Sequence, residues 1–491
     1  MPRRSRPPAA NGVRRKNEPT EYCNEGDHSL NRVSLSSVAW PEIGRAEVRP
    51  ELPQACFEKR VRALRERLAR EDLDCAVIYA DREHYANFKH FIGFEPRFEE
   101  GLAVIWREEG REDAVILGNE CACMAAYARI PVKFVLCQAL SLPGQPADRF
   151  VSMEDCLREA GLASGLRVGL IGWKLFTEAF GRDHRHMFCV SAFIVEALRN
   201  VVGEHIVNAT GLLIDPRDGL RLVNDADEIA YLEYGAALAS QCVCDAWKAL
   251  RPGMREAEAA GAYKVYGQQL SCHVMLSSGE NAWKGLVSPG FRTIKQGDPI
   301  SMSVGLEGGL SCRGGYAAYA AEDIEPAQRD FAEQVAMPYY EAVVAWYEKI
   351  GIGVTGGELY DTVDRLIPKQ KFGWTLNPGH MIAYEEWLTS GIAPGSTARF
   401  GSGMIVQMDI IPSFKPYVAP NAEDGICIAD ATLREEIRGR YPQLWDRFMR
   451  RRAYMQEELG IRLKEEILPM SNLAGRYSPY LLDTERAFIA R

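Results

Sequence analysis

The stretch KQGDPISMSVGLEGGLSCRGGYAAY, residues 295–319, carries the clearest structural signal in the chain. Its apolar run at 299–306 is typical of a buried strand, and glycine-rich turns follow that run. Helices beside a largely antiparallel sheet predict an α+β domain over residues 220–440. The other runs with strand-like or helical patterns in this domain lie at 220–241, 271–277, 326–349, 356–367 and 374–430.

Upstream of this domain, short apolar runs alternate with segments of helical spacing. Strands that alternate with helices predict an α/β domain with a central sheet over residues 53–219. The turn signal DPRDG at 215–219 marks the predicted end of that domain. The apolar runs are CAVIYA at 75–80, GLAVIW at 101–106, DAVILG at 113–118, VKFVLC at 132–137 and LRVGLIG at 166–172.

The two ends of the chain differ from these domains. Residues 1–52 are predicted to be an N-terminal arm, because their start is basic, contains prolines and has few apolar residues. Such an arm is expected to be extended or loosely docked, and an arm docked between subunits is the alternative. Residues 441–491 are predicted to be a helical extension, because apolar residues alternate there with the basic run 450–452.

Composition limits the possible classes of protein. The chain has 491 residues, a net charge of −9 and 47% hydrophobic residues, so it can bury a full core and lacks the basic surplus of a nucleic-acid binder. It contains no run of about 18 apolar residues, so we expect no membrane span, and it does not open like a secretory signal peptide. The 13 cysteines, an odd number, predict reduced, buried thiols in a cytoplasmic protein.

Several motifs occur in an order that resembles the creatinase, aminopeptidase P and prolidase superfamily, whose catalytic domain has the pita-bread fold. Besides the stretch at 295–319, these motifs are NFKHFIGF at 87–94, LRLVNDADEIAYLEYGAALAS at 220–240, LSSGENA at 276–282, PGHMIAYE at 378–385, GMIVQMDIIP at 403–412 and GICIAD at 425–430. The resemblance implies a two-domain member, with an α/β N-terminal domain and an α+β pita-bread domain.

The resemblance also shows where metal ligands are missing. Peptidases of this superfamily bind two metal ions through two aspartates, one histidine and two glutamates. A gap-free alignment places Ser303 and Gly314 at the aspartates, His380 at the histidine, and Asp409 and Ala429 at the glutamates. Three of these positions therefore cannot bind metal as the family does, and we expect neither a metal nor another cofactor. A metal held through Glu385, Glu307 or His273 stays an alternative.

Three residues are predicted to be catalytic. The resemblance places His380 in the active-site loop, where a neutral imidazole can take and give a proton. Asp409 lies in an apolar strand, where a carboxylate is costly to bury unless it is paired. Glu385 follows His380 by five positions, and it would orient His380 or the substrate together with Asp409. The alternative for His380 and Asp409 is a hydrogen-bonded role in the core.

Other residues are predicted to contact the substrate. Lys284 and Arg313 are charges beside the expected cavity, and Trp387 stands where the family has a second histidine. Arg97 and Phe98 match residues that creatinase-like dimers send into the partner's active site, so the resemblance implies a homodimer. The alternatives are solvent-exposed side chains for the cations and a surface ion pair for Arg97. Cys312 is a further alternative, as a nucleophile.

These observations lead to three functional hypotheses. The first is a creatinase-like, metal-independent hydrolase that cleaves a C–N bond in a small charged metabolite, either amino-acid-like or with a guanidino or amide group. The second is an inactive pita-bread protein that binds or scaffolds. The third is a metal-dependent Xaa-Pro aminopeptidase. In the first case the partners are a small-molecule substrate and a second copy of the chain.

Overall fold

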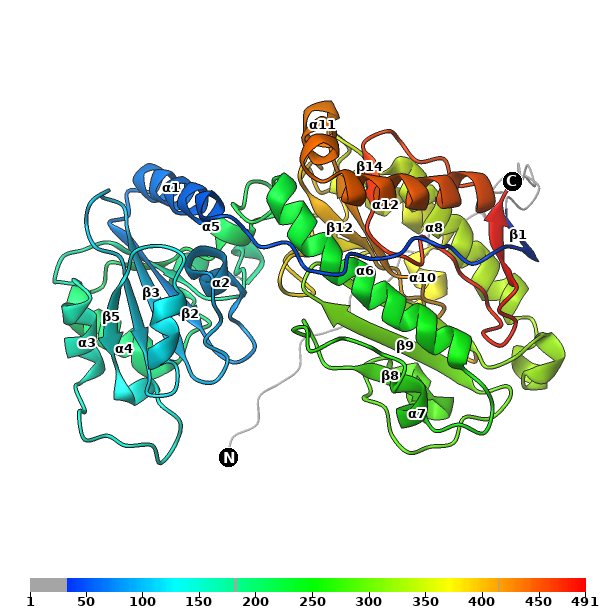
Figure 1. Cartoon of the computed structure of the whole chain (residues 1–491), viewed down its shortest axis with the longest axis horizontal. Helices are drawn as coiled ribbons and strands as arrows, with labels where there is room; N and C mark the ends of the chain where they lie inside the picture. Colours follow the sequence, from blue (N-terminus) through cyan, green and yellow to red (C-terminus); the bar gives the residue numbers. More distant parts are fainter. Residues whose placement is uncertain (1–32, 181–182, 414) are drawn as a thin grey trace, which may run out of the picture. The chain divides into compact units, whose positions relative to one another are not determined.

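The computed structural model describes residues 33–180, 183–413 and 415–491 (Figure 1). The basic start of the predicted arm, residues 3–16, lies outside the described residues. None of the helices in the described part has both the length and the apolar character that a membrane span requires.

The N-terminal domain is built on a six-stranded mixed sheet, in the order β5-β4-β3-β2-β6-β7. Alternate residues of β2 point to opposite faces: Ile78 packs in one core with α1 and α2, and Val77 packs in another with α3 and α4. The sheet is thus buried on both faces, which confirms the predicted α/β class. Its elements are β2 (Cys75–Ala80), β3 (Gly101–Trp106), β4 (Ala114–Leu117), β5 (Lys133–Leu136), β6 (Val168–Ile171), β7 (Ile206–Asn208), α1 (Gln54–Arg70), α2 (Ala86–Ile92), α3 (Met153–Glu159), α4 (Ala192–Val202) and α5 (Gly211–Ile214).

The second domain contains two antiparallel sheets and has the predicted α+β composition. One sheet has the order β10-β9-β8, and the other has the order β11-β12-β13-β14. The elements of this domain are β8 (Met275–Ser278), β9 (Pro299–Leu306), β10 (Gly309–Tyr316), β11 (His380–Met381), β12 (Ile405–Met408), β13 (Asp424–Ile428), β14 (Ile467–Pro469), α6 (Ala226–Ala249), α7 (Glu256–Ala260), α8 (Met337–Lys349), α9 (Gly356–Leu366) and α10 (Lys369–Phe372).

Helix α6 packs closely against the β9–β10 hairpin (Figure 1). The helix starts at a capping box, in which Asp225 accepts hydrogen bonds from the backbone N–H groups of Asp227 and Glu228. A Cβ added at Gly235 would lie 1.9 Å from the carbonyl oxygen of Glu307 at the hairpin tip. Glycine is therefore required there for the helix and the hairpin to approach each other, and this contact fixes the hairpin beside the site described below.

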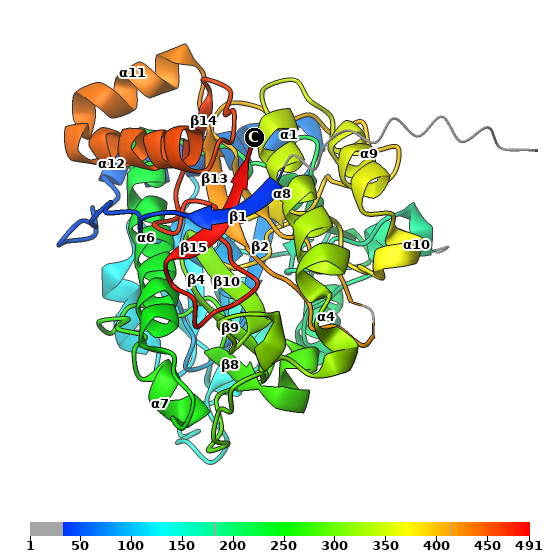
Figure 2. The same ribbon diagram turned by 90° about the vertical axis from the view of Figure 1, so that its right-hand side faces the viewer.

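The C-terminal segment differs from the predicted helical extension. Residues after 440 form α12 (Pro442–Ala453), which packs against α11 (Ala431–Arg440), but β14 and β15 (Arg486–Ala490) follow. Strand β14 pairs with β13, and β15 pairs with β1 (Val33–Ser37), as Figure 2 shows. The prediction of an all-helical segment was wrong because the apolar periodicity ends with α12, and later apolar residues are buried on strands.

Candidate active site

His380 lies at the centre of a buried cluster of acidic side chains. Its Nε2 atom is 3.0 Å from Oε1 of Glu386, 3.8 Å from Oε1 of Glu423 and 4.0 Å from Oδ2 of Asp409. The side chain of His380 is fully buried, whereas that of Glu386 is 24% exposed. The cluster is therefore reached from solvent on the side of Glu386.

Three neighbouring strands position these groups. His380 on β11 pairs directly with Gln407 on β12, and Asp409 follows Gln407 by two residues, which is the spacing of side chains on one face of a strand. Glu423 immediately precedes β13, the next strand of the sheet. Gly379 has a φ of +126°, and a Cβ there would meet the carbonyl oxygen of Gln407 at 2.6 Å, so glycine is needed just before His380.

Four buried polar atoms of this site have no hydrogen-bond partner among the described residues. They are Oε1 of Gln407, Oδ1 of Asp409, Oε1 of Glu423 and Nε2 of His380, whose contact with Glu386 is an ion pair without hydrogen-bond geometry. The amide nitrogen of Gln407 donates to the carbonyl oxygen of Leu310, which fixes Oε1 as the free acceptor. Because buried polar groups are normally paired, this concentration of unpaired atoms indicates a place where a ligand binds.

The charges of the cluster shift each other's protonation. Burial would lower the pKa of His380, but the carboxylates of Glu386, Glu423 and Asp409 outweigh burial and hold that pKa well above the usual 6.5. Burial raises the pKa of Asp409 to about 7. Burial, together with the neighbouring Asp409, also raises the pKa of Glu423 well above its usual value. Near neutral pH the free site therefore contains an imidazolium and protons shared among its carboxyl groups.

The walls of the site are aromatic and apolar. The ring of Trp387 stacks on His380 with 4.2 Å between ring centroids, and Trp387 is 39% exposed. This places Trp387, a predicted substrate-binding residue, at the site.

Cys312 is buried, and burial together with the nearby carboxylates raises the pKa of its thiol well above the usual range. A neutral thiol is a poor nucleophile, which argues against that alternative.

Glu385, predicted to be catalytic, does not face His380. Its carboxylate instead accepts hydrogen bonds from both terminal nitrogens of Arg221, at 2.7 and 2.5 Å. The adjacent Glu386 lies beside His380, in the place that was expected for Glu385. The prediction took Glu385 from the resemblance to the family, but β11 ends at Met381 and the irregular loop after it turns Glu386 toward His380 instead.

Arg313 was predicted to bind substrate, but the structure buries it in an ion pair. Its Nη2 is 2.6 Å from Oδ2 of Asp424, and both side chains are at most 2% exposed. It is therefore a structural residue of the interior.

Lys284, Arg97 and Phe98 make no described contact with the His380 cluster. Lys284 is exposed, with its Nζ atom 3.2 Å from Oδ1 of Asn281. Arg97 donates to the carbonyl oxygen of Arg82 at 2.9 Å, and Phe98 is 66% exposed. Their placement against a second copy of the chain stays a prediction.

Glu423 is the site residue that sequence reasoning missed. The alignment put Ala429 at the second glutamate position, but Ala429 is buried in the core beside α12 and β14. The acidic pair Glu423 and Asp424, directly before the apolar run GICI, was the signal that could have revealed it. With Glu423, three of the five family positions carry a side chain that can bind metal.

The site fits one metal ion better than the family's pair. Ser303 and Gly314 lie on the hairpin strands, and neither supplies a carboxylate there. By contrast, ligand atoms of His380, Glu386 and Glu423 all lie within 4.8 Å of one another. Glu307 and His273, which the sequence offered as alternative metal ligands, lie outside this group. Glu307 pairs with Arg49, and His273 is hydrogen-bonded to the carbonyl oxygen of Leu286.

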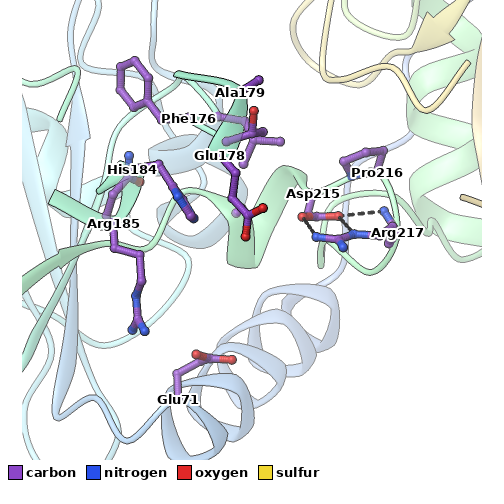
Figure 3. A pocket seen from close by; sticks show the side chains of 13 residues that line it. Glu71, Phe176, Glu178, Ala179, His184, Arg185, Asp215, Pro216 and Arg217 are labelled. Carbon is purple, nitrogen blue, oxygen red and sulfur yellow. Dashed lines mark hydrogen bonds and ion pairs between the residues drawn. The ribbon is translucent and has the colours of Figure 1, made fainter. Parts of the chain in front are cut away.

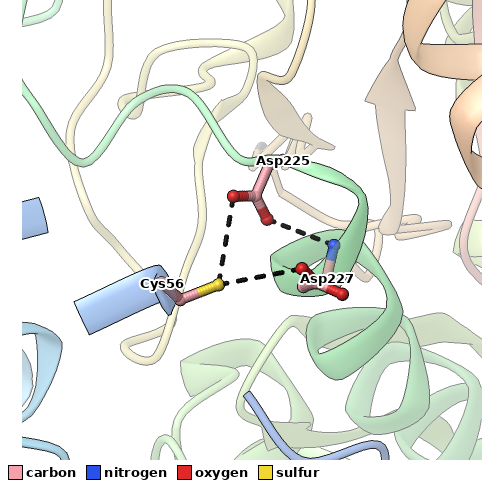
Figure 4. Close-up of side chains that lie close together, drawn as sticks. All are labelled: Cys56, Asp225 and Asp227. Atoms are coloured by element: carbon pink, nitrogen blue, oxygen red, sulfur yellow. Dashed lines mark hydrogen bonds between the residues drawn. The ribbon is translucent and has the colours of Figure 1, made fainter. Parts of the chain in front are cut away.

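A second acidic cluster, Cys56 with Asp225 and Asp227, is structural (Figure 4). Both aspartates already have partners: Asp225 caps α6 and pairs with Lys59, and Asp227 accepts from Arg440 and Tyr441. Burial, together with the neighbouring carboxylates, raises the pKa of the Cys56 thiol to about 12. Because both aspartates are already engaged, this cluster stabilises the start of α6.

A cavity of about 740 Å³ lies in the N-terminal domain. Figure 3 shows its charged lining, in which Asp215 and Arg217 already pair with each other. None of its lining residues belongs to the His380 cluster.

Comparison with known proteins agrees with this architecture. Residues 230–436 match metallopeptidase family M24. Among solved structures, the chain resembles an Xaa-Pro dipeptidase from Bacillus anthracis, with a TM-score of 0.57 and 16% identity over 77% of this chain and 96% of that one. It also resembles the prolidase from Pyrococcus horikoshii OT3, with a TM-score of 0.56 and 16% identity over 76% and 95% of the two chains. The His243Ala form of Escherichia coli aminopeptidase P gives a TM-score of 0.55 and 15% identity over 77% and 93%.

No curated protein matches the chain in sequence at a significant level. The fold, the order of the motifs and the family match together define a two-domain pita-bread protein. The part of the chain that resembles metallopeptidase family M24, residues 230–436, contains the whole His380 cluster.

Proposed function

We propose that the chain hydrolyses a C–N bond in a small substrate with a cationic group, such as a guanidino acid or an amino-acid amide, without the metal pair of its family. The observation that carries this proposal is the set of unpaired atoms around His380. Three of the four are oxygens, which accept hydrogen bonds when they are unprotonated, so a ligand with N–H or O–H donors or a positive charge fits them. A guanidinium group supplies five such donors in one plane.

The residues of the site have separate roles in this reaction. Asp409, Glu423 and Gln407 hold the cationic group through their free oxygens. A bound cation stabilises the ionised carboxylates, so His380 no longer needs its proton to balance them and becomes a neutral base. Its Nε2 then takes a proton from the attacking water and returns it to the departing nitrogen. Trp387 holds the imidazole ring in place by stacking.

The test uses the full-length protein after treatment with a chelator and measurement of its metal content. It is incubated with guanidino acids, amino-acid amides and Xaa-Pro dipeptides, and released amines, urea and ammonia are measured. We expect turnover of a guanidino or amide compound by the metal-free protein. Turnover that returns only with added manganese or cobalt would contradict metal independence, and thermal stabilisation without product would indicate a binding protein.

His380→Gln is expected to lower kcat by about 10²–10⁴-fold, because it removes the group that moves the proton. The matched control is His273→Gln, which removes an exposed histidine that bonds to a backbone carbonyl outside the cluster. We expect the control to keep its activity. Equal rates for His380→Gln and the parent enzyme would rule out the proposed mechanism.

A hydrolase with a single metal ion is the second candidate. It is favoured by the closeness of the ligand atoms of His380, Glu386 and Glu423, an imidazole and two carboxylates. An ion bound there would polarise a carbonyl group of the substrate. The structural relatives include Xaa-Pro dipeptidase and prolidase, so Xaa-Pro dipeptides are its first test substrates. Stoichiometric binding of one ion, required for dipeptide cleavage, would establish this candidate.

A further inference from the structure

The Glu385 carboxylate belongs to a chain of hydrogen bonds that crosses from the N-terminal domain to the active site. Arg221, whose side chain is 1% exposed, binds this carboxylate through both terminal nitrogens. The same Arg221 Nη1 donates to Oδ1 of Asn87 at 2.7 Å. Asn87 lies on α2 of the N-terminal domain, and its amide donates to the carbonyl oxygen of Gly172 at 2.7 Å.

The active-site end of this chain is the loop at residues 382–388. Glu385 lies beside Glu386 and Trp387 in sequence, and both of these contact His380. The ends of the loop are joined by backbone hydrogen bonds, from Met381 N to Thr389 O at 2.8 Å and from Leu388 N to Met381 O at 3.0 Å. Because the loop is short, the direction of Glu385 also sets the places of the next two side chains.

We propose that Asn87, Arg221 and Glu385 form a positioning relay by which the N-terminal domain holds Glu386 and Trp387 against His380. A planar guanidinium that makes two parallel bonds fixes the orientation of its carboxylate as well as its distance. Nη1 of Arg221 donates to both Glu385 and Asn87, so Asn87 helps to hold the guanidinium that binds Glu385. The N-terminal domain contributes no side chain to the His380 cluster, but through this relay it determines the geometry of the cluster.

The first test measures amide hydrogen exchange of the full-length protein by mass spectrometry and needs no substrate. Glu385→Gln keeps the shape of the side chain but removes its charge, and Asn87→Ser removes only the outer member of the relay. We expect both variants to speed exchange in peptides that cover 380–389 by about tenfold or more. The control is Lys59→Gln. This substitution removes the ion pair between Lys59 and Asp225, whose charged atoms lie 3.0 Å apart at the start of α6, and it leaves the loop at 382–388 untouched.

The second readout is the split between kcat and KM, and it alone rests on the proposed function. With a substrate found in the panel above, we expect Asn87→Ser to lower kcat about tenfold with little change in KM, because it disturbs Glu386 and Trp387 rather than the substrate contacts. Unchanged exchange in both variants, or the same increase in Lys59→Gln, would overturn the relay. Failure to find a substrate would count against the proposed function and leave the exchange result to decide the relay.

Discussion

The side chain of His90 on α2 illustrates how one buried residue makes stability depend on pH. Burial lowers the pKa of His90 well below the usual 6.5, and the neighbouring cations Arg60 and Arg221 lower it further. In the unfolded chain the same histidine binds a proton below about pH 6.5. Acid therefore favours the unfolded state, and stability is lost as the pH falls below that value.

Replacing this histidine is expected to remove that dependence. Between about pH 6.5 and about pH 5.5, the parent protein should lose about 1 kcal/mol more unfolding free energy than His90→Gln. Denaturant unfolding of both proteins at the two pH values measures this difference, and all other titrating groups cancel. Parallel pH profiles would show that His90 has the same pKa in the folded and unfolded states, which would contradict the lowered pKa.

At the same scale, single residues decided which parts of the site could be predicted. The Pro-Gly pair and the apolar strand around Asp409 pointed to His380 and Asp409, and the structure brings both into the cluster. Sequence could not choose between Glu385 and Glu386, because adjacent residues in an irregular loop differ in direction without any period. Glu423 was missed because the motif GICIAD at 425–430 was matched to the second glutamate strand, which put Ala429 at the glutamate position.

At the level of elements, the contact between α6 and the hairpin makes a sharp prediction. Gly235→Ala should lower stability by about 2 kcal/mol, because the new methyl group would overlap the carbonyl oxygen of Glu307. The matched control is Gly439→Ala on α11, where nothing lies within 4 Å of the added Cβ. That variant should gain up to about 1 kcal/mol from better helix propensity. Unfolding that places both variants on the same side of the parent protein would contradict the close packing.

Helices and strands with a clear hydrophobic pattern could be predicted from the sequence. Strands that form only by pairing with a strand far away in the sequence could not. Strands β2 to β6 of the N-terminal domain lie within the quoted apolar runs, because that sheet is covered on both faces, whereas the three-residue β7 lies outside them. Strand β14 has three residues and depends on pairing with β13. Such a short strand leaves no periodic signal, so only the tertiary structure reveals it.

For the whole molecule, Arg476 connects segments that are far apart in sequence. It is fully buried and donates to the carbonyl oxygens of Val38 at 2.8 Å, Ala39 at 3.1 Å and Thr484 at 2.8 Å. Arg476→Met should cost about 3 kcal/mol or more, because these carbonyl groups would stay buried without a charged donor. We expect faster proteolysis within 33–52 as the measurable sign.

The control for this prediction is Arg486→Met. Its ion pair with Asp483 is partly exposed, with the Arg486 side chain 44% exposed, and such surface pairs contribute about 0–1 kcal/mol. Equal protease resistance of the two variants would mean that the segment at 33–52 is held by other contacts.

The pairing of β13 with β14 and of β1 with β15 has a consequence for how the protein is made. Ribosomes release the chain from its N-terminus, and domains fold as their residues emerge. The strand that follows Glu423 keeps an open edge until residues 467–469 appear, and β1 waits for residues 486–490. Open edges attract other strands, so the sheet that holds the His380 cluster needs protection until β14 has emerged. A product truncated before residue 467 would lack this edge partner, which couples completion of synthesis to assembly of the active site.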